Sequence, residues 1–149
     1  MKSLGILATH PIQYYTPIFQ YLAKESGLNL TVFYCLKPAP KEQGSGFGVP
    51  FQWDRDYLSG YRHVWLENQA ENPGLDHFFG LDTPEIYNIV KTQNFDAFLI
   101  MGWNHKSMWQ VIEACRRTST PLLVRGDSHL HVRGQWFKRA AKELSHRYI

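Results

Sequence analysis

The chain has 149 residues, of which 44% are hydrophobic, 15% aromatic and 19% charged, and its formal net charge is +3. This length suits one domain that buries roughly 68–70% of its unfolded surface, which is enough for a proper core. So small a charge does not favour a nucleic-acid partner, and no apolar run approaches the roughly 20 residues that a membrane-spanning helix requires.

Apolar runs and amphipathic patterns alternate along the chain. The continuous runs 4–8, 30–35, 95–101 and 121–124 are typical of parallel strands buried on both faces, and residues 63–66 form a plausible additional strand. Helices are indicated where apolar residues recur at i, i+3, i+4 and i+7. The three sets are Tyr15, Ile18, Phe19 and Leu22; Met108, Val111, Ile112 and Cys115; and Phe137, Ala140, Ala141 and Leu144.

A weaker helix is predicted to begin at Thr83-Pro84-Glu85. The side chain of Thr83 can cap the helix, and Pro84 can take its first position. Its buried face would consist of Ile86, Ile89 and Val90.

These elements predict an α/β fold, a Rossmann-like open parallel sheet with helices on both faces. Right-handed crossovers and a nucleotide-binding strand order of 3-2-1-4-5 place the first strand beside the fourth, with the fifth next along. The polar stretches that follow these three strands would then be neighbours. They would lie at the sheet edge where open α/β folds bind ligands.

The first polar stretch is Thr9-His10-Pro11-Ile12-Gln13, between a strand and a helix. Backbone N–H groups at such a helix start can receive an anion, with His10 and Gln13 alongside. The stretch contains no glycine, which excludes a cradle of the P-loop kind. We favour a binding role because of its position, the alternative being that His10 and Pro11 only shape the turn.

The second stretch is Gly102-Trp103-Asn104-His105. Gly102 allows close approach, the indole of Trp103 suits stacking on a sugar ring, and the amide of Asn104 suits a hydroxyl. Trp103 fits a core position equally well.

The third stretch, Arg125-Gly126-Asp127-Ser128-His129, is the densest polar cluster. Arg125 suits an anionic group, and Asp127 and His129 suit hydroxyls or proton transfer. Because Asp127, Ser128 and His129 are adjacent in sequence, they cannot easily form a hydrolytic triad, which is assembled from separate segments. A metal site of His129 and His131 with His105 or His77 is only weakly indicated, so we expect no metal.

Three other features bear on function. Cys35 and Cys115 read as buried free thiols of a reducing compartment, which indicates a cytoplasmic protein. Residues 41–50 form a predicted flexible loop of the kind that can act as a lid. The predicted helix 135–148 carries Lys138, Arg139, Lys142 and Arg147, which usually means a solvated face; the weaker interpretation is peripheral contact with the inner face of the cell membrane.

Several motifs occur in a characteristic order and spacing. They are His10-Pro11-Ile12-Gln13-Tyr14-Tyr15-Thr16-Pro17, Gly46-Phe47-Gly48-Val49-Pro50-Phe51 with Trp53-Asp54, Gly60-Tyr61, Phe79-Gly80-Leu81-Asp82, Gly102-Trp103-Asn104 and Arg125-Gly126-Asp127-Ser128-His129. Together they resemble the N-terminal domain of bacterial family 4 glycosyltransferases, over nearly the whole chain. The first loop lacks the glycines that many members of this family have.

The resemblance implies the N-terminal half of a GT-B fold, in which two Rossmann-like domains face each other across a cleft. It implies metal-independent, retaining transfer of a sugar from a nucleotide sugar to a glycan or lipid-linked acceptor, with no cofactor. The N-terminal domain receives the acceptor, and a C-terminal domain holds the nucleotide and a pair of glutamates. Residues 1–149 would then be a truncated acceptor-side domain, inactive alone, whose partners are the two substrates and the missing domain.

On this interpretation Asp127 and His129 are the expected catalytic residues. The expected substrate-binding residues are His10, Gln13, Gly102, Trp103, Asn104, Arg125 and Ser128. Two other classes stay open. One is a stand-alone, flavodoxin-like ligand-binding or regulatory domain without catalytic activity, and the other is a hydrolase that uses the histidines.

Overall fold

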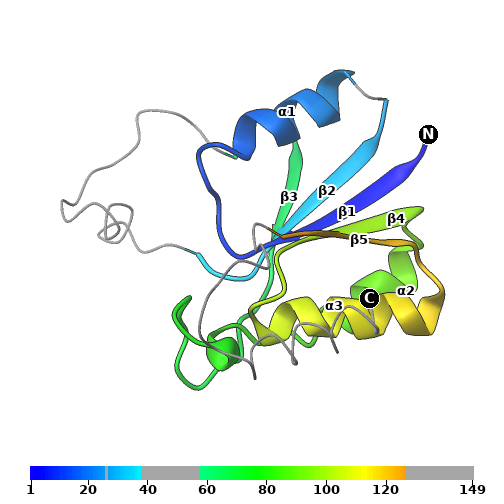
Figure 1. Ribbon diagram of the computed structural model, residues 1–149. Helices are drawn as coiled ribbons and strands as arrows, with labels where there is room; N and C mark the ends of the chain where they lie inside the picture. The colour runs from blue at the N-terminus through cyan, green and yellow to red at the C-terminus, as the bar shows by residue number, and fades with distance from the viewer. Residues whose placement is uncertain (26, 38–57, 127–149) are drawn as a thin grey trace, which may run out of the picture.

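The computed structural model describes residues 1–25, 27–37 and 58–126 (Figure 1). The predicted loop 41–50 and helix 135–148 lie outside the described residues. The elements in chain order are β1 (Ser3–Ala8), α1 (Thr16–Glu25), β2 (Asn29–Tyr34), β3 (Arg62–Trp65), the 3-10 helix η2 (Phe78–Gly80), α2 (Ile86–Gln93), β4 (Ala97–Met101), α3 (Lys106–Thr118) and β5 (Leu122–Arg125).

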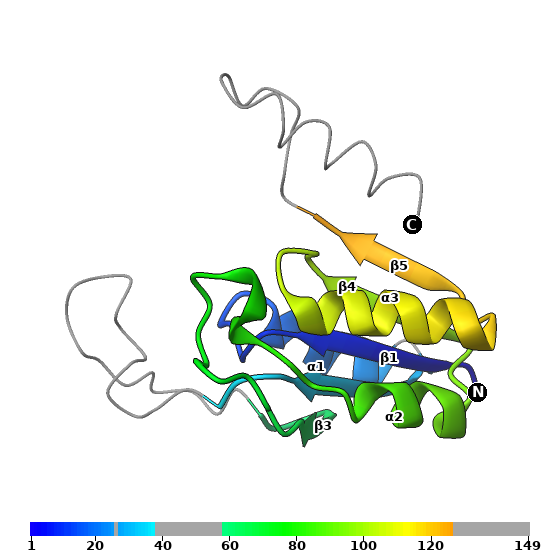
Figure 2. The same ribbon diagram turned by 90° about the horizontal axis from the view of Figure 1, so that it is seen from below.

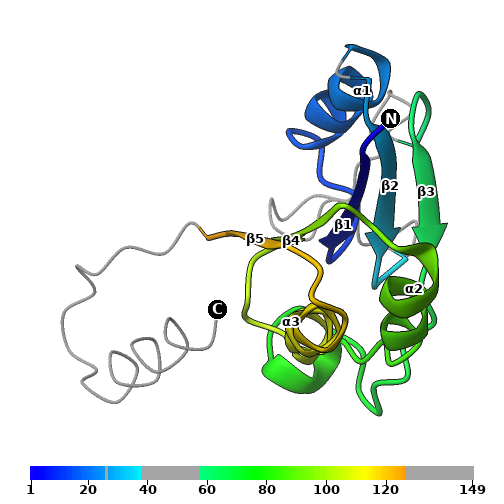
Figure 3. The ribbon, with the colours of Figure 1, turned by 90° about the vertical axis from the view of Figure 1, so that its right-hand side faces the viewer.

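The strands form one parallel sheet in the order β3-β2-β1-β4-β5 (Figure 3), and Figure 2 shows β3 and β5 at its two edges. This confirms the predicted order and the additional strand, which is β3. Helix α1 lies on one face of the sheet, and α2 and α3 lie on the other (Figures 1 and 3). The fold is therefore the predicted Rossmann-like α/β arrangement with helices on both faces.

The continuous apolar runs are explained by two cores, one on each side of the sheet. On one side Tyr15 and Phe19 of the α1 segment cover Ile6 and Val32. On the other side α2 and α3 cover alternate strand residues, including Leu7, Phe33, Phe98 and Ile100. The edge strand β5 differs from the central strands, because Leu123, on the α1 side of the sheet, is 54% exposed.

Two details of the sequence prediction are wrong. Thr83 does not cap α2 with its side chain: its buried hydroxyl donates a hydrogen bond to Ser107 Oγ at 2.9 Å, and α2 begins at Ile86. The hydroxyl of Thr83 thus bonds to Ser107 of α3 instead of to the backbone at the start of α2. Ile18 is 48% exposed, because the core face of α1 is centred on Tyr15 and Phe19.

Both cysteines are buried free thiols, as predicted. Burial raises the pKa of Cys35 to about 12, although hydrogen bonds with Ser107 and Thr83 act in the opposite direction. Burial also raises the pKa of Cys115 to about 11. Thiols with such high pKa values are poor nucleophiles, so both act as core residues. Among the described helices, none combines the length and apolar character needed to cross a membrane.

Candidate functional site

The carboxyl ends of β1, β4 and β5 lie side by side, so the polar stretches that follow them meet at one edge of the sheet. Leu7 pairs with Ile100, and Met101 pairs with Arg125. Of the expected site residues, Asp127, Ser128 and His129 lie outside the described residues. We call the described part of this region the carboxyl-edge site, and it contains His10, Gln13, Gly102, Trp103, Asn104, His105 and Arg125.

His10 follows β1 and is half-buried. Its Nδ1 lies 2.9 Å from the hydroxyl oxygen of Thr9. Burial, and then the nearby charge of His105, lower the pKa of His10. The imidazole is therefore neutral near neutral pH, a state in which one ring nitrogen donates and the other accepts a hydrogen bond.

His105 connects the edge to a more distant segment of the chain. Its Nε2 lies 3.1 Å from the carbonyl oxygen of Leu75. A carbonyl oxygen can only accept, so Nε2 carries the proton. In the neutral tautomer, Nδ1 of His105 is then an acceptor. His105 is also the residue that precedes α3, and its extended backbone turns the chain from β4 into that helix.

Arg125, the last residue of β5, lies over the aromatic ring of Tyr15, with Cζ 4.4 Å from the ring centroid. The ring of Tyr14 meets that of Tyr15 edge to face, with centroids 4.4 Å apart. No carboxylate forms a salt bridge with Arg125 in the part of the chain that the structure describes. Among the described residues the cation is thus held at the edge by a ring, and no carboxylate there occupies its N–H groups.

The loop after β4 has a fixed course. Gly102 has a φ of +117°, which L side chains rarely adopt, and no atom lies within 4 Å of the position that a Cβ would take. The half-buried Trp103 accepts a hydrogen bond at its carbonyl from Trp109 Nε1 at 2.9 Å. Asn104 is exposed, as is Gln13 across the edge, so both amides are accessible to a ligand.

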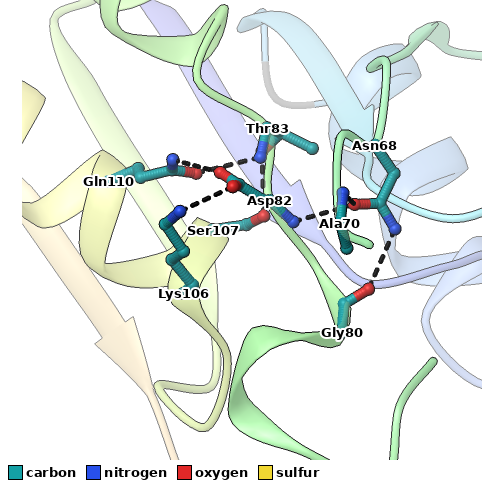
Figure 4. A network of polar contacts seen from close by, with 8 residues as sticks. All are labelled: Asn68, Ala70, Gly80, Asp82, Thr83, Lys106, Ser107 and Gln110. Carbon is teal, nitrogen blue, oxygen red and sulfur yellow. Dashed lines mark hydrogen bonds and ion pairs between the residues drawn. The ribbon is translucent and has the colours of Figure 1, made fainter. Parts of the chain in front are cut away.

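An ordered loop that the sequence did not predict, residues 66–83, runs beside this edge. We call it the β3–α2 loop. Its two ends are joined by a hydrogen bond from Gln69 N to Asp82 O at 2.7 Å. Asn68 bridges it internally: its amide donates to Gly80 O, and its Oδ1 accepts from the N–H groups of Ala70 and Asp82 (Figure 4). Only an irregular segment could be predicted here, because these hydrogen bonds join residues that no local sequence pattern relates.

Asp82 fastens the β3–α2 loop to the first turns of α3 (Figure 4). Its carboxylate accepts from Lys106 Nζ at 2.5 Å and from Gln110 Nε2 at 2.7 Å. Burial acts to raise the pKa of Asp82, but the two hydrogen bonds and the charge of Lys106 lower it overall. Gln110 also accepts from Thr83 N at 3.0 Å. This half-buried network is structural, since its charges are already paired.

The outer part of the β3–α2 loop carries exposed apolar side chains. Leu75, Phe78 and Phe79 are all exposed, and Phe79 is 67% exposed. The rings of Phe78 and Phe79 meet at 90° with centroids 5.0 Å apart. Within the described ranges no three potential metal ligands gather into a site, and His77 lies 2.9 Å from the Asp76 carboxylate.

Comparisons with known proteins leave the function open. No protein-family model matches the chain, and no curated protein matches it. Among solved structures it is similar to apo histidine-tagged saccharopine dehydrogenase (L-Glu forming) from Saccharomyces cerevisiae. The identity is 14%, the TM-score is 0.48, and the match covers 89% of this chain and 23% of that chain. The chain thus spans less than a quarter of the dehydrogenase, and so distant a likeness carries no argument about activity.

Proposed function

We propose that this chain is the acceptor-side domain of a cytoplasmic glycosyltransferase, which transfers a sugar from a nucleotide sugar to a glycan or lipid-linked acceptor. The observation that supports this most is the convergence of separate motif residues. His10, Trp103 and Arg125, which belong to three of the motifs that resemble family 4 glycosyltransferases, follow or end the neighbouring strands β1, β4 and β5.

The chemistry of the carboxyl-edge site suits a polyhydroxylated ligand. The neutral imidazole of His10 and the exposed amides of Gln13 and Asn104 can donate to and accept from hydroxyl groups. The stacked guanidinium of Arg125 offers N–H donors to an anionic or hydroxyl oxygen. In this proposal a second domain holds the nucleotide, and Asp127 and His129 contribute to proton handling during transfer.

The proposal is tested with the natural polypeptide that contains this chain. It is incubated with radiolabelled nucleotide sugars and a glycolipid extract, and label in the acceptor fraction is measured. We expect transfer without added metal, reduced at least tenfold by His129→Ala. Unchanged transfer in that variant would remove His129 from the mechanism.

A stand-alone ligand-binding domain is the alternative, and the five-stranded sheet with helices on both faces is compatible with it. It predicts that the isolated chain binds a small ligand tightly and that the natural polypeptide transfers no sugar. That combination of results would replace the glycosyltransferase proposal.

A further inference from the structure

The β3–α2 loop presents an apolar surface that is unusual for a loop. We call the exposed side chains of Leu75, Phe78 and Phe79 the aromatic tip. Single exposed apolar residues are common and need no explanation, whereas a group of them at one surface is a candidate interaction site. Within the described chain no helix or strand buries Phe79, which is 67% exposed.

The loop holds the aromatic tip in one geometry. Gly74 N donates to Gly80 O at 3.1 Å, and Gly80 N donates to His77 O at 3.2 Å, so the residues that flank the tip are bonded to each other. A Cβ on Gly80 would collide with the backbone of Gly74, so the backbone segments on either side of the aromatic tip are in direct contact. A surface that is ordered before binding loses little conformational entropy when a ligand arrives.

The aromatic tip is continuous with the carboxyl-edge site. The carbonyl oxygen of Leu75 receives the hydrogen bond of His105, and Asp82 ties the other end of the loop to α3. A ligand that reaches His105 is therefore close to Leu75, the first residue of the aromatic tip.

The charge around the aromatic tip selects among ligands. Residues 63–90 contain no lysine and no arginine, whereas Glu67, Glu71 and Asp76 are exposed. Lys106 reaches this loop from α3, but its charge is paired with that of Asp82. These carboxylates repel anionic phospholipid headgroups, nucleic acid and the diphosphate of a nucleotide sugar. An exposed aromatic ring beside carboxylate acceptors matches an uncharged sugar, whose C–H face is apolar and whose hydroxyls donate hydrogen bonds.

We infer that the aromatic tip is the binding subsite for an uncharged sugar residue of the acceptor, stacked on the ring of Phe79. Phe78 supports that ring edge to face, and the Asp76 carboxylate accepts from a sugar hydroxyl. The inference rests on the proposed function and adds a substrate class to it, namely an acceptor that ends in an uncharged glycan.

Ligand-observed NMR on the 149-residue chain tests this inference. The probes are cellohexaose, maltohexaose and chitohexaose, which are uncharged, and hexagalacturonate, which is anionic. We expect at least one uncharged probe to bind, and Phe79→Ala to weaken that binding about tenfold, as loss of a stacked ring would. Phe79→Trp should restore it. Tyr21→Ala is the matched control, because Tyr21 is a similarly exposed aromatic residue on α1.

Each remaining outcome overturns the inference. These are no binding by any uncharged probe, equal binding by hexagalacturonate, or an equal effect of Tyr21→Ala and Phe79→Ala. The two proposals fail separately. Sugar transfer that is indifferent to Phe79→Ala refutes the aromatic tip alone, whereas Phe79-dependent binding without any transfer by the natural polypeptide refutes the glycosyltransferase alone.

Discussion

The guanidinium of Arg125 lies on the ring of Tyr15, 4.4 Å from its centroid, and this contact joins the end of β5 to the start of α1. The two residues are separated by most of the described chain but meet at the carboxyl edge of the sheet. The ring positions the cation but, unlike a carboxylate, does not neutralise its charge. Among the described residues no carboxylate pairs with Arg125, so we propose that its N–H groups bind the ligand.

Arg125→Ala should reduce kcat/KM for sugar transfer by the natural polypeptide more than tenfold. Its cost in the free energy of unfolding should be small, about 0.5–1 kcal/mol, since exposed cation–π contacts contribute little. Arg117→Ala is the control, because Arg117 also lies over a ring, that of Tyr87 at 5.7 Å, but on the last turn of α3. Equal losses of activity in the two variants would show that Arg125 has no special role.

Asn68→Ala should loosen the β3–α2 loop. It removes three hydrogen bonds from a part-buried side chain, and we expect a loss of about 1–3 kcal/mol in the free energy of unfolding. Hydrogen exchange measured by mass spectrometry should become faster in residues 69–82 and stay unchanged in α3. Asn88→Ala, at an exposed position of α2, should change neither quantity. Unchanged exchange in the Asn68 variant would mean that other contacts order the loop.

Gly80→Ala should disturb the same loop by a different route. The added Cβ would meet the carbonyl group of Gly74, which is backbone and cannot move aside without breaking the loop's own hydrogen bonds. Gly74→Ala is the milder companion, because its Cβ would meet the Asp76 carboxylate, the far end of a flexible side chain. Urea unfolding should rank Gly80→Ala as the less stable variant, and the reverse ranking would contradict this packing.

His10 should make stability depend on pH. Burial, with the charge of His105, lowers the pKa of His10 in the folded state below the ordinary value of 6.5. Between the folded and unfolded pKa values the unfolded chain binds more protons, so the contribution of His10 is complete above about pH 6.5 and is lost as the pH falls through this window. Urea unfolding of wild type and His10→Gln from pH 7.5 to 5.5 measures it. As the pH falls, the free energy of unfolding should decrease less in His10→Gln than in wild type. Identical pH profiles of the two proteins would refute this role of His10.

The strand order and the meeting of the polar stretches could be predicted because they follow from local patterns and general rules. Apolar runs such as residues 95–101 indicate buried parallel strands, and crossover handedness then fixes which ends are neighbours. The bonding of Thr83 to Ser107 could not be predicted, because a capping residue and a residue bonded to another helix look alike in sequence.

The β3–α2 loop is a stronger example of contacts that the sequence pattern does not predict. Asn68, Gly80 and Asp82 are joined by side-chain to backbone hydrogen bonds across 12 and 14 positions, a spacing with no periodic signature. The sequence around Trp103 fits a core position and a binding position equally well, and the half-buried position of Trp103, with its carbonyl bonded to Trp109, is compatible with both. Asp127, Ser128 and His129 stay predictions, since they lie outside the described residues.

In the function that we propose, the carboxyl-edge site belongs to the acceptor side of a glycosyltransferase. The most direct measurement is the KM of each substrate for wild type and for His10→Asn in the natural polypeptide. We expect the KM for the acceptor to rise several-fold in the variant and the KM for the nucleotide sugar to stay unchanged. A rise confined to the KM of the nucleotide sugar, or the absence of any sugar transfer by the wild-type protein, would contradict it.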